Sequence, residues 1–425
     1  EDPQTRASSL GTPDAGKTAW ETNDEIMVIL TSDYFGEQTA TLTYGEDGTW
    51  APSGTLSYLE TERPTVMAVY TSSDTPGLGE YLITTDCTLA DNALSINFED
   101  ATRTYSRLRI ATLADLPLAV TTTGFTPAGA EEAGEHSYTI TADKKGNAYL
   151  YGTFAEGATV SVDGGYTPVD YTFSQEVHPN GTIAGKSYAL DARPYLTFTA
   201  DQPQTFKVST YQSYTLDESI QYSLNGGVWT KLDVGTEITF GGDNGALRLR
   251  GKSSGGTAST KYKYAFISFG ESKVKVTCSG DIRTLVDYDN YVTVSTANAR
   301  FCYLFRECAS LTTAPELPAT TLTEGCYKAM FYYCAGLTTA PKLPATTLAE
   351  GCYSNMFWNC KKLDNITMLA TDISAPNCLG GWVDGVASTG TFTKAASLEQ
   401  GTESGQIPTG IYGIPEGWTV KNYGE

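Results

Sequence analysis

The chain has 425 residues, 40% of them hydrophobic, and its 28 basic and 49 acidic residues give a formal net charge of −21. This length is sufficient for two to four domains with sizeable cores. The acidic charge repels nucleic acids, and no Lys/Arg cluster offers a surface for phosphates. No apolar run approaches the roughly 18 residues that a membrane-spanning helix needs. Composition and charge therefore argue against a nucleic-acid-binding protein and exclude a helical membrane protein.

Up to residue 270 the sequence shows short alternating apolar and polar runs bounded by Gly, Pro, Asn and Asp, which is typical of antiparallel strands. The clearest runs are 25–30, 65–70, 105–110, 148–154, 205–211 and 262–269. Asp47-Gly48 and Asn225-Gly226 predict tight hairpin turns, since Gly accepts positive φ. We expect β-sandwiches over residues 1–115 and 116–195 and a small β module over residues 196–270.

Residues 271–425 repeat themselves with a period of 26. The positions that keep this step are Phe305, Phe331 and Phe357; Cys308, Cys334 and Cys360; Leu311, Leu337 and Leu363; Leu317, Leu343 and Leu369; and Cys326, Cys352 and Cys378. A fixed period of this length predicts a solenoid, whose units bury their apolar faces by stacking. Each unit should begin with an extended segment that turns Leu311, Ala314 and Leu317 inward. A short helical turn over residues 324–334 and a closing cap near Trp418 complete the expected architecture.

Catalytic and metal-binding patterns are missing from the sequence. The two histidines, His136 and His178, lie in polar, loop-like segments, and no nucleophile elbow, H-E-x-x-H motif or P-loop occurs. There is no C-x-x-C spacing, and residues 143–146 and 287–290 lack the ligand pattern of a dedicated calcium loop. We therefore expect no enzyme, no cofactor and no metal site. The cysteine columns are predicted to be free and buried, with a Cys302–Cys308 disulfide as the alternative.

Candidate binding residues lie where the repeat varies while its frame stays constant. These positions form three columns: Arg306, Tyr332 and Trp358; Glu307, Tyr333 and Asn359; and Glu316, Lys342 and Met368. Aromatic side chains offer a large contact area at low entropic cost and are common at binding hot spots. We predict a ligand-binding surface of Tyr332, Tyr333 and Trp358, with Arg306 and Lys342. The alternative is that these are solvated or edge-packed aromatic residues in a Tyr-rich protein.

The repeat also carries a family resemblance. Its pattern F-x-x-C-x-x-L-T-x-x-P-x-L-P-A, combined with C-Y-x-x-M-F, resembles the BspA-like leucine-rich repeats of Bacteroidales surface proteins. The resemblance extends over residues 271–417. It implies a leucine-rich-repeat solenoid that presents a broad surface to a ligand.

The N-terminal part resembles the fimbrillin-like superfamily of the same bacteria, which comprises major and minor fimbrial subunits. The resemblance rests on Thr5-Arg6-Ala7, on residues 20–26 (WETNDEI) and on residues 42–52 and 148–162. It implies export as an outer-membrane lipoprotein, cleavage after Arg6 and polymerisation by β-strand exchange, in which a strand from another subunit fills an open sheet edge. Because the strand that precedes the Thr-Arg-Ala motif in the family is not in this sequence and the C-terminal segment reads as a cap, a tip or accessory subunit is expected rather than a stalk subunit.

Together these observations predict a mainly β protein of tandem antiparallel β-sandwich modules followed by a short, capped leucine-rich-repeat solenoid. The expected function is cell-surface adhesion or recognition. The partners would be a host or microbial surface protein or glycan and other fimbrial subunits, with a membrane contacted only through a lipid anchor. One alternative is a structural fimbrial or anchor subunit without a ligand of its own. Another is a carbohydrate-capture lipoprotein that binds sugars at Trp358, Trp229 or Trp382.

Overall fold

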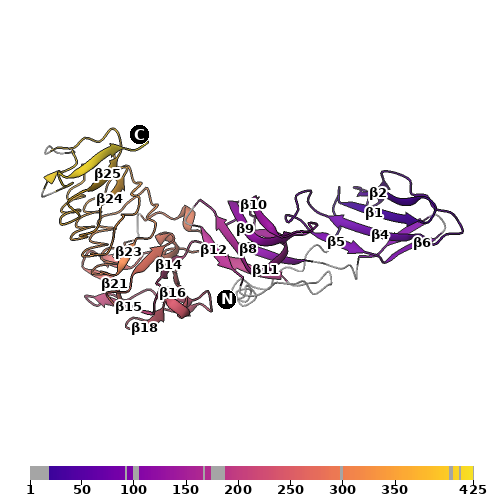
Figure 1. The fold of residues 1–425 in the computed structure, drawn as a ribbon. Helices are drawn as coiled ribbons and strands as arrows, with labels where there is room; N and C mark the ends of the chain where they lie inside the picture. The colour runs from indigo at the N-terminus through magenta and orange to yellow at the C-terminus, as the bar shows by residue number, and fades with distance from the viewer. Residues whose placement is uncertain are drawn as a thin grey trace. The chain divides into compact units, whose positions relative to one another are not determined.

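A computed structural model describes residues 19–424, except for 91–92, 99–104, 166–167, 174–186, 297–299, 402–404 and 411–412. The chain divides into two compact units, Glu1–Arg193 and Pro194–Glu425. The described part is mainly β, with several antiparallel sheets (Figure 1). Its only helical elements are the short 3-10 helices η1 (Gly242–Asn244), η2 (Ile282–Leu285) and η3 (Tyr291–Thr293). No helix in these residues is long and apolar enough to cross a membrane.

The first sheet of the N-terminal unit has five strands in the order β3-β2-β1-β4-β5. Their bounds are Trp50–Pro52, Gly36–Tyr44, Glu25–Ser32, Thr65–Thr71 and Tyr81–Thr84, and β6 (Cys87–Ala90) and β7 (Ala93–Ile96) form a separate hairpin. Alternate residues of β1 are buried, as its sequence predicts. The predicted turn at Asp47-Gly48 is confirmed, since β2 pairs with β3 and Gly48 has a φ of 78°.

The second sheet of this unit follows the order β10-β9-β11-β8-β13, and β12 also pairs with β11. The strands are β8 (Ser106–Ala111), β9 (Pro117–Pro127), β10 (Gly134–Thr141), β11 (Asn147–Asp163), β12 (Val169–Thr172) and β13 (Ser187–Asp191). β8 pairs with β11 and, in parallel, with β13. The expected module boundary at residues 115/116 therefore cuts through this sheet, because β8 belongs with the strands that follow it.

The C-terminal unit begins with two sheets that share one core. One has the order β17-β16-β19-β14-β22-β23 and the other the order β18-β15-β21-β20. Phe198 of β14 packs against Phe206 and Phe269 of the other sheet, with ring centroids 5.5 and 5.8 Å apart. The strands are β14 (Leu196–Thr199), β15 (Gln204–Tyr211), β16 (Gln221–Leu224), β17 (Thr230–Lys231), β18 (Glu237–Phe240), β19 (Leu247–Arg250), β20 (Ala258–Thr260), β21 (Lys263–Phe269), β22 (Val276–Ser279) and β23 (Leu311–Thr313). The predicted hairpin at Asn225-Gly226 is confirmed by the pairing of β16 with β17.

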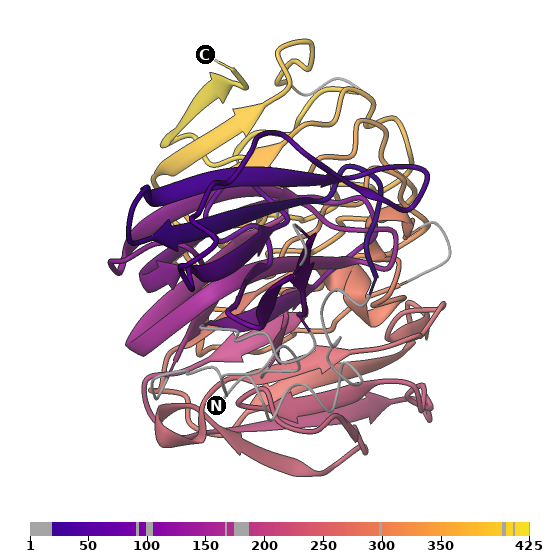
Figure 2. The ribbon, with the colours of Figure 1, turned by 90° about the vertical axis from the view of Figure 1, so that its right-hand side faces the viewer.

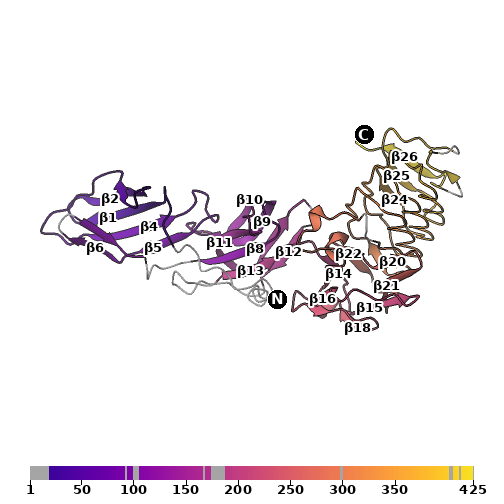
Figure 3. The ribbon, with the colours of Figure 1, turned by 180° about the vertical axis from the view of Figure 1, so that it is seen from behind.

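The 26-residue units stack directly onto these sheets. We call each unit a coil; the first two span residues 311–336 and 337–362. β23 pairs in parallel with β22, and further parallel bridges join Thr313 to Thr339 and Thr339 to Asn365. The ladder continues through β24 (Asn365–Met368), β25 (Gly390–Lys394) and β26 (Trp418–Asn422). The coils follow one another in this order away from β14 and β16, as Figures 1 and 2 show and as the view from behind confirms (Figure 3).

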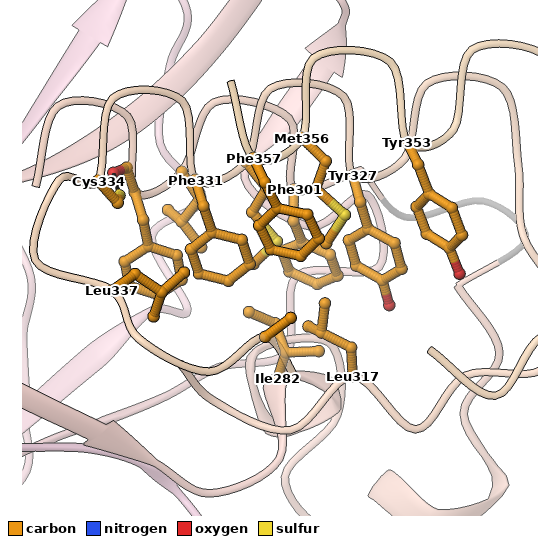
Figure 4. Close-up of a cluster of buried hydrophobic side chains, with 14 of the residues drawn as sticks. Ile282, Phe301, Leu317, Tyr327, Phe331, Cys334, Leu337, Tyr353, Met356 and Phe357 are labelled. Carbon is orange, nitrogen blue, oxygen red and sulfur yellow. Dashed lines mark hydrogen bonds between the residues drawn. The ribbon is translucent and has the colours of Figure 1, made fainter. Parts of the chain in front are cut away.

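Aromatic rings stack from one coil to the next. The centroids of Phe305 and Phe331 are 5.4 Å apart and those of Phe331 and Phe357 are 5.7 Å apart, with the ring planes within 7° of parallel. All three rings are fully buried. Figure 4 shows the rings of Phe331 and Phe357 together with Leu317, Leu337 and Ile282. The repeated positions therefore build the core, as their periodicity predicts.

This core is continuous with the core of the preceding sheets. A single cluster of buried side chains extends from Leu196 to Trp418 and includes residues of β14, β21 and all the coils. The expected boundary between residues 270 and 271 consequently falls inside one compact unit. The reason is that the apolar face of the two-sheet part has the first coil as its partner.

Two local expectations about the coils were wrong. Residues 324–334 form turns instead of a helical turn, because Gly325, Ala329 and Tyr333 adopt left-handed conformations with φ of 61°, 51° and 61°. In the third unit the inward residue is Met368, which is fully buried and pairs with Leu343, whereas Leu369 is only partly buried. Met368 is therefore not a candidate for contact with a ligand.

Candidate binding surface

Three of the five predicted binding residues lie together on the surface of the coils. The ring centroids of Tyr332 and Tyr333 are 4.7 Å apart, and those of Tyr332 and Trp358 are 6.3 Å apart. Tyr333 is 44% exposed, while Tyr332 and Trp358 are partly buried. We call Tyr332, Tyr333 and Trp358 the aromatic patch.

Tyr333 occupies a sharp corner of its coil. Its φ of 61° matches the values of 62°, 58° and 75° at the equivalent positions Glu307, Asn359 and Gly385. The left-handed conformation suits Gly and Asn, whereas a side chain such as Tyr is strained there. Backbone strain of this kind tends to persist where it serves a function. The corner thus holds an exposed aromatic ring at a position that does not favour it.

Arg306 is held in place by neighbouring side chains. Its Nη1 donates a hydrogen bond to the Tyr264 hydroxyl (3.0 Å), its Nη2 lies 2.9 Å from a Glu307 carboxylate oxygen, and the guanidinium lies 5.0 Å from the centre of the Phe266 ring. Burial opposes the charge of Arg306, yet the hydrogen bond to Tyr264 and the Glu307 carboxylate raise its pKa above the usual value. Arg306 is therefore already engaged by the protein.

Lys342 points to a different partner. Its Nζ donates to the Tyr423 hydroxyl at 2.8 Å and lies 4.6 Å from the centre of the Tyr423 ring. Tyr423 directly follows β26, the last strand of the ladder. Lys342 therefore connects its coil to the end of this final strand. Among the described residues it makes no contact with the aromatic patch.

A second set of aromatic residues was not predicted. Tyr211, Tyr264 and Tyr303 form a continuous stack, with centroids 5.2 and 4.5 Å apart and planes 22° and 16° from parallel. The stack joins β15 and β21 to the first turns of the repeat region. Burial raises the pKa of the Tyr264 and Tyr303 hydroxyls, so both stay protonated at neutral pH. Because the ring faces cover one another, this stack is a poor platform for a sugar ring.

Two tryptophans proposed as sugar-binding residues pack against other side chains of the protein. Trp382 is fully buried and lies against Phe357 and Phe392. The guanidinium of Arg250 lies 4.2 Å from the centre of the Trp229 ring, and Tyr195 packs against that ring at 4.8 Å. Of the three, only Trp358 belongs to the aromatic patch.

The cysteine columns have a structural place. All nine cysteines are free, and all except the half-buried Cys87 are buried, as the repeat positions predict. The thiols of Cys334 and Cys360 donate to the carbonyl oxygens of Phe305 and Phe331 in the preceding turns of the chain, at 2.9 and 3.1 Å. Burial raises the pKa of Cys302 to about 12, and neither Cys302 nor Cys308 is bridged.

The remaining sequence-predicted residues divide into two groups. Arg6 and His178 lie outside the described residues. His136 was expected in a loop but is partly buried in strand β10, between Phe125 and Tyr138 at ring distances of 5.9 and 6.1 Å. Within the described ranges, no three His, Cys, Asp or Glu side chains gather into a possible metal site.

Fold and surface together define a mainly β protein whose C-terminal unit stacks 26-residue coils and exposes an aromatic patch. No model of a known protein family matches the sequence, and no curated protein matches it either. Relatives therefore add nothing to the assignment of a function, which has to be argued from the surfaces of the molecule.

Proposed function

We propose that this protein is a cell-surface recognition or adhesion protein that binds a host or microbial ligand through its C-terminal coils. In this proposal the coils are a short leucine-rich-repeat solenoid of the BspA-like kind, carried by fimbrillin-like β-sandwich modules. The protein would be exported and attached to the outer membrane, as a tip or accessory subunit of a fimbria. It would not be an enzyme.

The observation that carries the proposal is the aromatic patch, and above all Tyr333. An aromatic ring that is 44% exposed gains little from the folded state, and the φ of 61° opposes it further. The equivalent residues Asn359 and Gly385 show that the corner forms without an aromatic side chain. A contact with another molecule gives this ring a role, since exposed aromatic residues are frequent anchors of interfaces.

The test compares adhesion of the full chain with that of a patch variant. The variant combines Tyr332→Ala, Tyr333→Ala and Trp358→Ala and is applied to panels of matrix proteins, glycans and microbial cells. The control is Tyr34→Ala with Phe35→Ala, which removes another exposed aromatic pair, 71% and 46% exposed with centroids 4.9 Å apart. We expect the patch variant to lose adhesion by at least about tenfold and the control to keep it. Equal adhesion of both variants would refute a role for the patch.

A structural subunit without a ligand of its own is the second candidate. An apolar groove in the N-terminal unit favours it: Val28 and Leu30 of β1, Leu42 of β2, and Leu89 and Leu94 of the β6–β7 hairpin line this groove. A strand from another subunit of the same assembly would bury these side chains and pair its backbone. Concentration-dependent polymers that disappear in a Leu42→Lys variant, without adhesion by the intact chain, would support this role over recognition.

A further inference from the structure

We infer that a polar groove on the coils, separate from the aromatic patch, is a binding site for a neutral oligosaccharide. The inference rests on the proposed recognition function and names a class of ligand for it. The groove is lined by side chains of Lys261, Glu324, Lys328, Glu350, Ser354 and Asn377. None of the five binding residues predicted from the sequence lines it.

The floor of the groove is a column of three stacked β-turns, at residues 325–328, 351–354 and 377–380. In each turn the last N–H donates to the first carbonyl: Lys328 to Gly325 at 3.1 Å, Ser354 to Gly351 at 3.2 Å and Gly380 to Asn377 at 3.1 Å. The last residue becomes smaller from turn to turn, from Lys to Ser to Gly. The loss of side-chain volume along the column opens the hollow.

A ligand in this groove would be bound by side chains and not by the backbone N–H groups of the turns. The N–H groups of Gly325 and Gly351 already donate to the carbonyls of Glu350 and Pro376, at 2.9 and 3.0 Å. In the described part of the chain, the side chains of Lys328, Glu350, Ser354 and Asn377 have no hydrogen-bond or ion-pair partner. They offer an ammonium donor, carboxylate and amide acceptors, an amide donor and a hydroxyl, which is a set that can pair with sugar hydroxyls.

The charge of the groove favours a neutral ligand. Lys261 and Lys328 balance Glu324 and Glu350, and Lys261 already lies 3.5 Å from Glu324 in an exposed ion pair. A sulfated or sialylated glycan would gain no net attraction here, and the molecule as a whole carries a charge of −21. The lining also lacks the apolar pocket that anchors a peptide side chain.

An exposed aromatic ring lies next to the groove. Tyr262 is 65% exposed, follows Lys261 in the sequence and has its ring centre 5.8 Å from the Lys261 Nζ. An aromatic ring beside hydrogen-bonding side chains is a common arrangement for holding a sugar, because the apolar face of the sugar packs on the ring. The groove crosses three coils that follow one another at about 4.8 Å, so its length suits two or three sugar units.

The test fills the groove with lysine side chains, since the first of its three turns already ends in Lys328. Ser354→Lys and Gly380→Lys reproduce Lys328 in the second and third turns. Gly380 does not have a positive φ, and a Cβ there would meet no atom closer than 3.5 Å, so the fold accepts the change. Thr320→Lys combined with Thr346→Lys, at exposed and equivalent positions of the first two coils outside the groove, is the charge-matched control.

The full-length protein and these variants are applied to arrays of neutral gluco-, manno- and N-acetylglucosamine oligosaccharides and their sulfated and sialylated counterparts, followed by calorimetry. We expect at least one neutral oligosaccharide to bind. The double variant should weaken this binding by about tenfold or more, the equivalent of one or two lost ligand hydrogen bonds. The double control of Thr320→Lys with Thr346→Lys should keep it.

Several results would overturn the inference: no neutral oligosaccharide binds, only anionic glycans bind, or the double variant binds as well as the unmodified chain. Adhesion to a protein that is lost in the patch variant but kept in the groove variant, with no glycan bound, would reject the groove and leave the proposed function standing. Absence of every adhesion and glycan interaction would reject both.

Discussion

The left-handed corner at Tyr333 leads to a prediction about stability that is independent of any ligand. Tyr333→Ala and Tyr333→Gly remove the same ring and the same contact with Tyr332, 4.7 Å away between centroids. They differ only in the Cβ atom. Since the backbone φ is 61°, the comparison of the two variants isolates the strain at the corner.

An L-residue in the left-handed conformation loses about 1–2 kcal/mol, whereas Gly adopts it freely. At an ordinary position Gly is instead less stable than Ala by roughly 0.5–1 kcal/mol, because its unfolded chain has more freedom. The two effects have opposite signs at residue 333. We therefore expect Tyr333→Gly to be more stable than Tyr333→Ala by about 1 kcal/mol, or about 2–4 °C in the melting temperature of a unit of this size.

The neighbouring Tyr332 supplies the control, because its φ is not in the positive range. There the order should reverse, with Tyr332→Gly less stable than Tyr332→Ala by roughly 0.5–1 kcal/mol. Urea unfolding followed by circular dichroism measures all four variants. If Tyr333→Gly were less stable than Tyr333→Ala by as much as Tyr332→Gly is less stable than Tyr332→Ala, the corner would not hold a strained residue, and the main argument for the aromatic patch would fail.

Four further predictions concern the core, the reactivity of the thiols, their effect on the pH dependence of stability, and the last strand. Phe331→Ala should destabilise the C-terminal unit by about 3–5 kcal/mol, since it opens a cavity in a fully buried ring stack, and a loss below about 1 kcal/mol in urea unfolding would contradict this packing. In the folded protein at pH 8 only Cys87 should react with a thiol reagent, because the other eight thiols are buried. Burial raises the pKa of Cys87 as well, and that of Cys302 to about 12, so Cys87 should react more slowly than an exposed cysteine; rapid modification of more than one thiol without denaturant would be inconsistent with this. The same shift has a defined sign: above a pH of about 9 the unfolded thiols ionise while the buried ones stay protonated, so the free energy of unfolding should fall, by up to about 1.4 kcal/mol per pH unit for each such thiol. Lys342→Met removes an exposed contact with Tyr423 and should change stability by less than about 1 kcal/mol, and a larger loss in thermal unfolding would show that this contact fixes the final strand.

Periodicity made the buried column of repeated residues predictable. Phe305, Phe331 and Phe357 recur at one step in the sequence and lie in one column of the structure. The one-residue shift at Met368 could not be seen in the sequence. Leu369 keeps the 26-residue period, but Met368 is the side chain that faces the core. Regular spacing identifies equivalent units, but it does not report a local change in their register.

Partners of strands and side chains could not be derived in the same way. The alternation in β8 shows that it is a strand but does not indicate which sheet it joins. Similarly, nothing in the sequence next to Arg306 points to Tyr264, which lies 42 residues earlier in the chain. The turns at the corners had a weak signal, since Asn355, Asn359, Gly381 and Gly385 are residue types that tolerate positive φ. The polar groove also had a weak signal in the sequence, because the equivalent positions Lys328, Ser354 and Gly380 carry smaller side chains from one unit to the next.

The single ladder that runs from β22 to β26 has a consequence for how this protein can change over generations. Along the backbone ladder each coil pairs only with its neighbours, so a duplicated block of 26 residues would enter the ladder as one more rung and leave the first and last strands as they are. The sheet of β14 and β22 would still start the array, and β26 would still finish it. The length of the stack and the area of its outward face can therefore change in steps of one coil, while the sheets at the start of the stack stay the same.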